Sequence, residues 1–469
     1  MRTITTLFTL MALFLPLHAR AGEGKPAGEA RRLNVILISA DTLRGDMLGV
    51  NGNREVKTPR LDELASQGVN FRRAYTNITT TTPSHAAMLT SLYPRDHRAY
   101  DNQSKISSEI VTLPERLKKA GYHTAGIVNM PWLNPDVTGV TQGIDELARG
   151  DHIRKAEKTV PWVLDFLDRR KAKAEEPFFL FVHLTDNHTP YHAPEGHDRL
   201  YYPKDKDPKA GLPGSLQKIW PLFPKDHIDN VYVKRWIGDI ADADYVVGAY
   251  KGSVTWLDRW MGKIFDRLKA NGQWEDTLVV FTADHGESLG EHGLWFCHGG
   301  LFEPTTRIPL ILRIPGGPAG AQVETIVDTV DIVPTVLGRL GLEAPGSLRG
   351  EDLWPVIEGK VKAGGAAYLQ HTGNQLEGVV TPRYKLVLHR KTRTDIYAAY
   401  PIERGRVELY DLEKDPGETK NIAKANPKVV AELTALMKKL RAGGPSFEAG
   451  AAKVDADTEE ALRALGYVQ

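Results

Sequence analysis

Residues 33–46 read LNVILISADTLRGD, and this stretch decides the fold. The continuous apolar run at residues 35–38 is typical of a strand covered on both faces, as in a parallel sheet between helical layers. Asp41 follows where this strand should end. Ligands of open α/β sheets collect at the carboxyl ends of the strands. Asp41 is therefore a candidate site residue, and the search for partners begins at the ends of the other strands.

Further strand-like runs alternate with stretches of helical spacing. The predicted strands cover residues 123–128, 178–184, 278–281 and 309–314, and the predicted helices include residues 59–67, 113–121 and 254–268. Thr58 is the predicted cap of the first of these helices, with Pro59 at its first position and Gly68 at its end. This alternation predicts an α/β fold with a largely parallel sheet.

The pattern changes in two places. Residues 195–237 are rich in Pro, Lys, Asp and aromatic residues and lack periodicity, so we expect an inserted loop region that forms part of a pocket wall. After residue 345, short strand-like runs at 367–370 and 384–389 precede a helix over 427–441. We expect a catalytic domain over 33–345 and a small α+β subdomain over 346–469.

The N-terminus carries an export signal. Arg2, an apolar run over residues 5–17 and small residues before Gly22 predict a signal peptide over 1–21, followed by a linker over 22–32. The alternative is an uncleaved membrane anchor, although the run is short for spanning a bilayer. We expect a periplasmic or secreted protein with no membrane span once the signal is removed.

Bulk composition excludes some functions. The formal net charge is +1 and no basic stripe is present, so we expect no nucleic-acid partner. The single cysteine, Cys297, cannot form an internal disulfide. Its alternatives are a thiol nucleophile or a small packing residue, and we favour the second because no activating group is evident.

Three polar sequences combine into one chemical arrangement. Asp284 and His285 follow the strand over 278–281, as Asp41 follows the first strand, and two carboxylates with an imidazole can hold a divalent metal ion. Thr81 precedes the helical sequence AAMLTSL, and a helix N-terminus stabilises anions. A metal ion would activate the Thr81 hydroxyl as a nucleophile. The alternative for Thr81 is a helix cap in a Thr-rich turn.

Linked motifs between residues 34 and 423 give the chain a family resemblance. They include DTLRGDMLG, TPSHAAMLTSLYP, PFFLFVHLTDNHTPY, TADHGESLGEHG and LYDLEKDPGETKNIA. In this order and spacing they resemble the sulfatases, within the alkaline phosphatase superfamily. The resemblance implies an alkaline phosphatase-like three-layer sandwich with a large mixed, mostly parallel sheet. It also implies a hydrolase acting on ester bonds of a small molecule, a glycan or a lipid.

The resemblance also implies roles for single residues. The implied metal ligands are Asp41, Thr81, Asp284 and His285. Thr81 occupies the nucleophile position, His188 matches a histidine that contacts the ester or leaving group, and His298 lies near the place of a lysine that binds the oxyanion. His85 takes the place of an arginine and is expected to line the pocket or to support the helix start. Asn129 is expected to contact substrate from a strand-end loop or to serve the scaffold.

Departures from the family pattern change the expected chemistry. Sulfatases convert Cys or Ser at the nucleophile position into formylglycine, and a threonine cannot form that aldehyde, so we expect no formylglycine here. The usual lysine-histidine pair is absent, and Thr42 replaces a second aspartate. A threonyl ester at phosphorus can be released by water, which favours phosphodiester or phosphonate substrates. Family membership favours sulfate esters, and both remain open.

The cofactor and the general function leave further alternatives. We expect one divalent ion; His285 favours Mn²⁺ or Zn²⁺, whereas the sulfatase resemblance favours Ca²⁺. A second ion would require Asp186, His188, His192 and His298 to converge. The alternatives to an ester hydrolase are a phosphotransferase on the same scaffold and a catalytically decayed anion-binding protein.

Overall fold

The computed structural model describes residues 32–150, 155–191, 194, 196–211, 214–223, 236–361, 365–394, 397–454, 456 and 459. The predicted signal peptide over 1–21, and the predicted linker apart from Arg32, lie outside the described residues. Within the described ranges, none of the helices combines the length and the apolar character that crossing a bilayer requires.

The main sheet has eight strands in the described part of the chain and is mixed but mostly parallel. Its order is β13 (Ala321–Val323), β2 (Val69–Phe71), β12 (Leu310–Arg313), β8 (Thr277–Thr282), β1 (Asn34–Ala40), β7 (Phe178–Leu184), β5 (His123–Val128) and β6 (Glu146–Arg149). Only β12 runs antiparallel to its neighbours among these pairings. The predicted α/β architecture is confirmed.

The centre of this sheet is fully covered. Every residue of β1 and β7 is buried, as the continuous apolar runs predict. β1 lies between β7 and β8 and pairs with both in parallel, with Val35 opposite Phe179 on one side and Leu278 on the other. Because parallel strands end at the same edge, the residues that follow β1 and β8 come together there.

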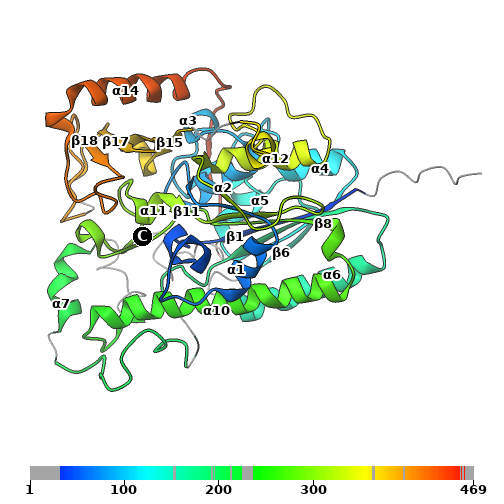
Figure 1. The fold of residues 1–469 in the computed structure, drawn as a ribbon, viewed down its shortest axis with the longest axis horizontal. Helices are drawn as coiled ribbons and strands as arrows, with labels where there is room; N and C mark the ends of the chain where they lie inside the picture. The colour runs from blue at the N-terminus through cyan, green and yellow to red at the C-terminus, as the bar shows by residue number, and fades with distance from the viewer. Residues whose placement is uncertain are drawn as a thin grey trace, which may run out of the picture.

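Helices cover both faces of the sheet and complete a three-layer sandwich (Figure 1). One layer contains α1 (Pro59–Ser66), α6 (Ala156–Lys171) and α10 (Ala243–Ala270), which pack against one another. The other contains α2 (Thr81–Thr90), α4 (Leu113–Lys119) and α12 (Ile332–Arg339). Shorter helices are α3 (Pro94–His97), α5 (Pro135–Thr138), α7 (Ser215–Ile219), α11 (Glu303–Thr306) and α13 (Trp354–Ile357).

Two helical boundaries differ from the sequence prediction. Thr58 makes no side-chain cap; its hydroxyl accepts from the Gly49 amide at 2.8 Å. The Asp258 carboxylate of α10 instead accepts from the first free amides of α1, with Leu61 at 2.8 Å. The helix predicted over 254–268 is the second half of α10, which begins at Ala243.

The C-terminal sheet lies beside the sandwich, with α14 (Pro427–Arg441) packed on it (Figure 1). Its antiparallel order is β15 (Ala367–Gln370), β16 (Leu376–Val380), β17 (Tyr384–His389) and β18 (Val407–Asp411). The predicted strands over 367–370 and 384–389 and the helix over 427–441 are confirmed. Small two- and three-stranded sheets pair β9 (Ser288–Leu289) with β10 (Trp295–Cys297), β4 (Ser104–Lys105) with β19 (Gly450–Ala451), and β3 (Ala74–Tyr75) with β11 (Arg307–Ile308) and β14 (Val327–Asp328).

A buried ion cluster connects the C-terminal sheet to the sandwich. Lys385 on β17 is fully buried, and its Nζ lies 2.8 Å from Glu303 Oε1 on α11 and 2.8 Å from Glu418 Oε1. These two carboxylates raise the pKa of Lys385 against the opposing effect of burial, so its charge is retained. Removing one member of such a cluster leaves a buried charge unpaired, which is strongly destabilising.

Candidate active site

The carboxyl edge of the sheet gathers a group of metal-ligand side chains. Asp41 follows β1, while Asp284 and His285 follow β8, and one ligand atom from each lies within 4.8 Å of the others. All three side chains are fully buried. The backbone amides of Thr42 and His285 both donate to Asp284 Oδ1, at 3.1 and 2.8 Å, and thereby fix the orientation of this carboxylate.

The ligand atoms of this group have no hydrogen-bond partners within the described part of the chain. These atoms are both carboxylate oxygens of Asp41, Asp284 Oδ2 and His285 Nε2. Buried polar atoms are nearly always satisfied. His285 Nδ1 pairs with its neighbour Gly286 O at 3.0 Å, which leaves Nε2 as the ligand atom. Two carboxylates and one imidazole nitrogen that converge without donors fit a divalent cation.

The electrostatics of the two carboxylates agree with that interpretation. Burial, and then the neighbouring Asp41 charge, raise the pKa of Asp284 well above its usual range. Two carboxylates this close cannot both be charged at low cost without a cation, so the raised pKa of Asp284 favours a proton on this group when no ion is bound. A divalent ion would displace that proton and neutralise both groups.

Helix α2 brings Thr81 to this edge. Thr81 is the first residue of α2 rather than part of a preceding loop, and it is buried. The first turn of the helix is bonded to the metal-ligand group, because Ser84 Oγ donates to Asp284 O at 2.7 Å. His85 Nδ1 also lies 3.8 Å from Asp284 Oδ2. The N-terminus of α2 therefore lies beside the carboxylate cluster.

His85 supports Thr81 from within the protein. Its Nδ1 pairs with Thr81 O at 2.8 Å and its Nε2 with Ser39 Oγ at 2.9 Å, and its side chain is fully buried. Burial, with His183 nearby, lowers the pKa of His85 to about 3, so the ring is neutral. Because both ring nitrogens are engaged by the protein, the geometry favours the supporting role over the substrate contact that we also considered.

Asn129 has a similar supporting position. Its side-chain amide donates to His183 O at 2.6 Å and to Thr159 Oγ1 at 3.0 Å. His183 in turn places its Nε2 3.5 Å from Asp41 Oδ2. Sequence reasoning missed His183. The signal was a polar residue inside the otherwise apolar strand over 178–184, in a sheet covered on both faces.

His188 and His298 approach the cluster from two loops. His188 follows β7 and is partly buried, and its electrostatic interaction with Asp41 lowers the pKa of that carboxyl against the opposing effect of burial. His298 follows β10, with its ring centroid 4.5 Å from that of His285. Burial opposes a positive charge on His298, but Glu287, whose Oε1 lies 3.7 Å from its Nδ1, outweighs it and raises the pKa of His298. Sequence reasoning missed Glu287, although it lies in the same motif as His285.

The C-terminal sheet also reaches the site. Thr372 shares a hydrogen bond between hydroxyl groups with Thr80, the residue before Thr81. The neighbouring His371 is buried, and burial, with the nearby His298, lowers the pKa of His371 to about 4. Neither residue was predicted, because nothing in the sequence marks which end of β15 faces the sandwich.

Other predicted groups lie elsewhere or play other parts. The Asp186 carboxylate accepts from the Ala156 amide, with both oxygens at 3.1 Å. His192 lies outside the described residues. Within the described ranges, the group of Asp41, Asp284 and His285 is the one that gathers three metal-ligand side chains. Cys297 is buried, and burial raises the pKa of its thiol, which favours the packing role.

Residues of the predicted insertion over 195–237 pack against the loop that carries His298. Phe223 and Trp236 place their rings 5.7 and 6.3 Å from the ring of Phe296, two residues before His298. Tyr191 lies 6.1 Å from the same ring. This aromatic cluster braces β10 and the turn that follows it.

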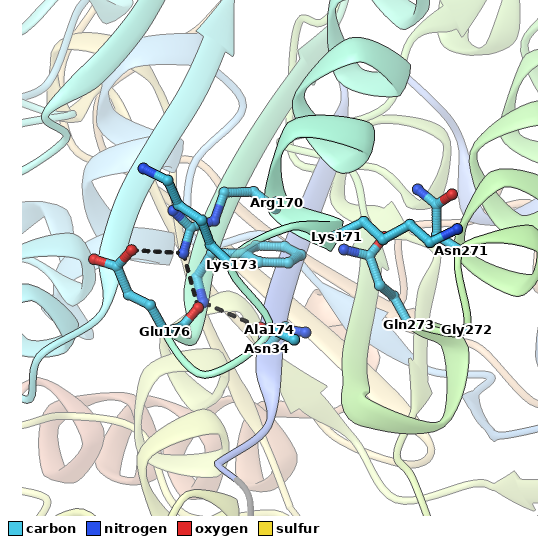
Figure 2. A pocket seen from close by; sticks show the side chains of 10 residues that line it. Asn34, Arg170, Lys171, Lys173, Ala174, Glu176, Asn271, Gly272 and Gln273 are labelled. Atoms are coloured by element: carbon cyan, nitrogen blue, oxygen red, sulfur yellow. Dashed lines mark hydrogen bonds and ion pairs between the residues drawn. The ribbon is translucent and has the colours of Figure 1, made fainter.

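A cavity of about 260 Å³ lies at the opposite end of the sheet. It is lined by residues at the starts of β1 and β7, such as Asn34 and Phe178, and by the end of α6 (Figure 2). Arg170 and Glu176 form an ion pair on its wall. Because the cavity lies at the amino ends of the strands, it is separate from the metal-ligand group.

Comparison with known proteins agrees with the architecture. A family model described as sulfatase matches residues 33–342, and a model of the C-terminal part of N-sulphoglucosamine sulphohydrolase matches residues 290–443. An arylsulfatase from Clostridium perfringens is 27% identical over 451 residues, covering 83% of this chain and 90% of the relative.

Solved structures show the same fold. A protein in complex with its substrate D-glucosamine-2-N,6-O-disulfate superimposes with a TM-score of 0.72 at 21% identity, covering 87% of this chain and 97% of that one. A phosphonate monoester hydrolase of Agrobacterium radiobacter gives a TM-score of 0.68 at 24% identity, covering 88% and 96%. The fold and its relatives define an ester-bond hydrolase with an alkaline phosphatase-like sandwich. Since the first family model spans more than half of the chain, the protein belongs to the sulfatase family.

Proposed function

We propose that this protein is an exported, metal-dependent hydrolase of phosphate or sulfate esters, with Thr81 as its nucleophile. The observation that carries the proposal is the set of unpaired ligand atoms on Asp41, Asp284 and His285 beside the first turn of α2. These residues, together with Thr81 Oγ1, would hold one divalent ion. When bound, the ion supplies positive charge that lowers the pKa of a bound hydroxyl group and stabilises anionic oxygens.

The residues of the chain divide the reaction between them. The Thr81 hydroxyl would lose its proton to solvent water, its oxygen attacks the phosphorus or sulfur atom, and the bond to the leaving oxygen breaks. His188 gives a proton to that oxygen, and His298 donates to a non-bridging oxygen of the transferred group. Water then attacks the covalent threonyl ester and returns the Thr81 hydroxyl. His85, through its bond to Thr81 O, holds the nucleophile in place.

The threonine also favours one class of substrate. Water can hydrolyse a phosphorylated threonine at phosphorus. A sulfated threonine lacks the hemiacetal collapse that formylglycine offers. We therefore place phosphodiesters and phosphonate esters first and sulfate esters second. The relatives support both groups, since they include an arylsulfatase and a phosphonate monoester hydrolase.

The remaining parts of the proposal concern the ion and the location. The imidazole of His285 favours Mn²⁺ or Zn²⁺ over Ca²⁺. The signal-like sequence of residues 1–21 supports export of the mature protein to the periplasm or out of the cell. We also propose 33–345 as the catalytic domain and 346–469 as the subdomain that completes the site through His371 and Thr372.

The test is an ester panel with defined metals. Purified mature protein is assayed with Mn²⁺, Zn²⁺ or Ca²⁺ on an aryl phosphodiester, an aryl phosphonate, a phosphate monoester and a sulfate. We expect turnover of the phosphodiester or phosphonate, and a mass shift on Thr81 after rapid quenching. Thr81→Ala removes the activity, whereas Thr81→Ser keeps a hydroxyl and retains it to within about tenfold.

Two results would contradict the proposal. Wild-type turnover that survives Thr81→Ala would exclude the threonine nucleophile. Wild-type and Thr81→Ala proteins that are equally inert on every ester with metal present would support an anion-binding protein instead.

A further inference from the structure

A buried lysine stands one loop away from the metal-ligand group. Lys155 immediately precedes α6, and its exposed fraction is 7%. Among the described residues it makes no ion pair. Its ammonium group donates instead to two backbone carbonyls, Thr185 O at 2.7 Å and Pro190 O at 3.3 Å. Burying an ammonium against neutral acceptors is costly, so a lysine in this setting calls for an explanation.

The two carbonyls lie at the two ends of one short loop. Residues 185–190 follow β7 and contain His188, and the Thr185 carbonyl also accepts from the His188 amide at 3.3 Å. Within the loop, His188 Nδ1 pairs with Thr189 O at 2.7 Å. Lys155 therefore joins the start of the loop to its end, with the histidine between its two attachment points.

A second set of hydrogen bonds joins the same two segments, and here the loop supplies the acceptor side chain. Asp186 in the loop accepts from the amide of Ala156, the residue next to Lys155, with both carboxylate oxygens at 3.1 Å. Asn187 donates to Ser253 Oγ of α10 at 2.8 Å. The loop is thus held by groups at the start of α6 and on α10, two helices of one layer, and each attachment lies within three residues of His188.

The charges place this assembly close to the reacting groups. Burial lowers the pKa of Lys155, and the nearby charges of Asp186 and Asp41 oppose that effect. Asp41 also interacts with His188. Lys155 and His188 therefore both interact electrostatically with the same carboxylate.

We propose that Lys155 is a positioning residue for ester cleavage, which holds the carbonyls of Thr185 and Pro190 so that His188 is aimed at the leaving oxygen. This inference rests on the proposed function, in which His188 gives a proton to that oxygen. The contribution of Lys155 is then specific. It matters most when the leaving group is a poor one that needs the proton, and least when the leaving group departs as a stable anion.

The experiment measures kcat and KM on a series of aryl esters whose leaving phenols differ in pKa. Lys155→Met keeps the length of the side chain and removes its donors; Lys158→Met, at an exposed position of the same helix, is the matched control. For Lys155→Met we expect kcat to fall about 10–100-fold on phenyl esters and less than about threefold on 4-nitrophenyl esters, with KM unchanged. For Lys158→Met we expect kcat to depend on the pKa of the leaving phenol as it does in the wild type.

A double-mutant cycle separates positioning from a general structural effect. His188→Ala should steepen the same dependence, and Lys155→Met added to it should slow the reaction no further, because the two residues act through one proton transfer. If Lys155→Met is too unstable to purify, Lys155→Gln, which retains one donor group, replaces it and gives an intermediate slope.

The outcomes distinguish the inference from the function on which it rests. A folded Lys155 variant with the wild-type slope, or one that slows all esters equally, overturns the positioning role. The positioning role is also overturned if the rate reduction in the double variant equals the product of the reductions in the Lys155 and His188 single variants. An active wild-type enzyme whose slope is unchanged by His188→Ala removes the role of His188 itself. Wild-type protein inert on all esters overturns the proposed function and this inference with it.

Discussion

The two ends of the main sheet differ in how their charged side chains are arranged. At the carboxyl end, two aspartates and a histidine converge with their ligand atoms unpaired. At the amino end, beside the cavity in Figure 2, Arg170 donates to Glu176 at its backbone oxygen and at its carboxylate, at 2.8 and 2.9 Å. Like charges that converge need an external cation, whereas opposite charges satisfy one another. The sign pattern, rather than the presence of a cavity, therefore favours the carboxyl end as the proposed site of the chemistry.

The largest expected effect on activity comes from substituting a carboxylate at the carboxyl end of the sheet. Asp284→Asn should lower kcat/KM by on the order of 10³-fold or more, because it removes one of two anionic ligands of the activating ion. The same change should leave the thermal stability of the metal-free protein unchanged or higher, because the repulsion from Asp41 is lost. Enzyme assays and thermal unfolding in a chelator measure both.

Glu176→Gln at the amino end serves as the control for this experiment. It also removes one carboxylate, yet it should leave kcat/KM unchanged. A metal-free Asp284→Asn protein that unfolds well below the wild type would show that the carboxylate pair is structural, and the contrast between the two ends would fail.

Adding a metal ion should increase the stability of the folded protein through the carboxyl end of the sheet and not through the amino end. At a free ion concentration of 100 times its Kd, a bound ion should stabilise the folded protein by about 2.7 kcal/mol. Unfolding followed by circular dichroism, with and without Mn²⁺ or Zn²⁺, measures this shift. Asp41→Asn should abolish the shift, and Arg170→Met should not. An equal shift in the Asp41 variant would place the ion elsewhere.

A substitution at the amino end of the sheet should lower the stability of the protein without changing its activity. Arg170→Met removes the hydrogen bonds to Glu176 while retaining the apolar stem of a side chain that is 3% exposed. We expect a loss of about 1–2 kcal/mol in the free energy of unfolding, limited because the Glu176 carboxylate is half exposed. Urea titration gives the loss, and kcat/KM should stay at the wild-type value. Reduced activity without reduced stability would indicate a functional link between the ends.

The smallest effect is expected at the rim of the same cavity. Lys171 lines it but is exposed. Lys171→Ala should change the free energy of unfolding by no more than about 0.5 kcal/mol and leave catalysis unaltered. A larger change, measured in the same urea titration, would mean that the cationic rim contributes more than its exposure suggests.

Sequence reasoning performed best where the physical signal is local. The strand over 178–184 and the helix over 427–441 agree with the structure in both bounds, because a nearly continuous apolar run and a continuous helical spacing need no partner to be recognised. The rule that parallel strands end at one edge was enough to bring Asp41 and Asp284 together. Thr81 could be placed beside them only through the family resemblance.

The failures are long-range in origin. Thr58 has the right chemistry for a helix cap, but Asp258 supplies the acceptor from a residue 197 positions after Leu61. The first half of α10 was missed because Gly248 and Gly252 weaken its helical pattern. The backbone of Tyr201 approaches Gly248 closely, so that a Cβ at this position would lie 3.1 Å from the Tyr201 carbonyl oxygen. His371 became recognisable only once the tertiary fold placed it near His298, whereas His183 and Glu287 had weak local signals whose meaning depended on the fold.

The Lys385 cluster has a consequence for how this protein can be recombined with its relatives. Its three charges come from two units, with Glu303 in the sandwich and Lys385 and Glu418 in the C-terminal part of the chain. A chimera that exchanges the C-terminal sheet at residue 345 therefore inherits the lysine from one parent and one of its counter-ions from the other. Such a hybrid folds only if both parent proteins carry all three charged residues. The cluster therefore restricts which C-terminal sheets can be joined to this sandwich.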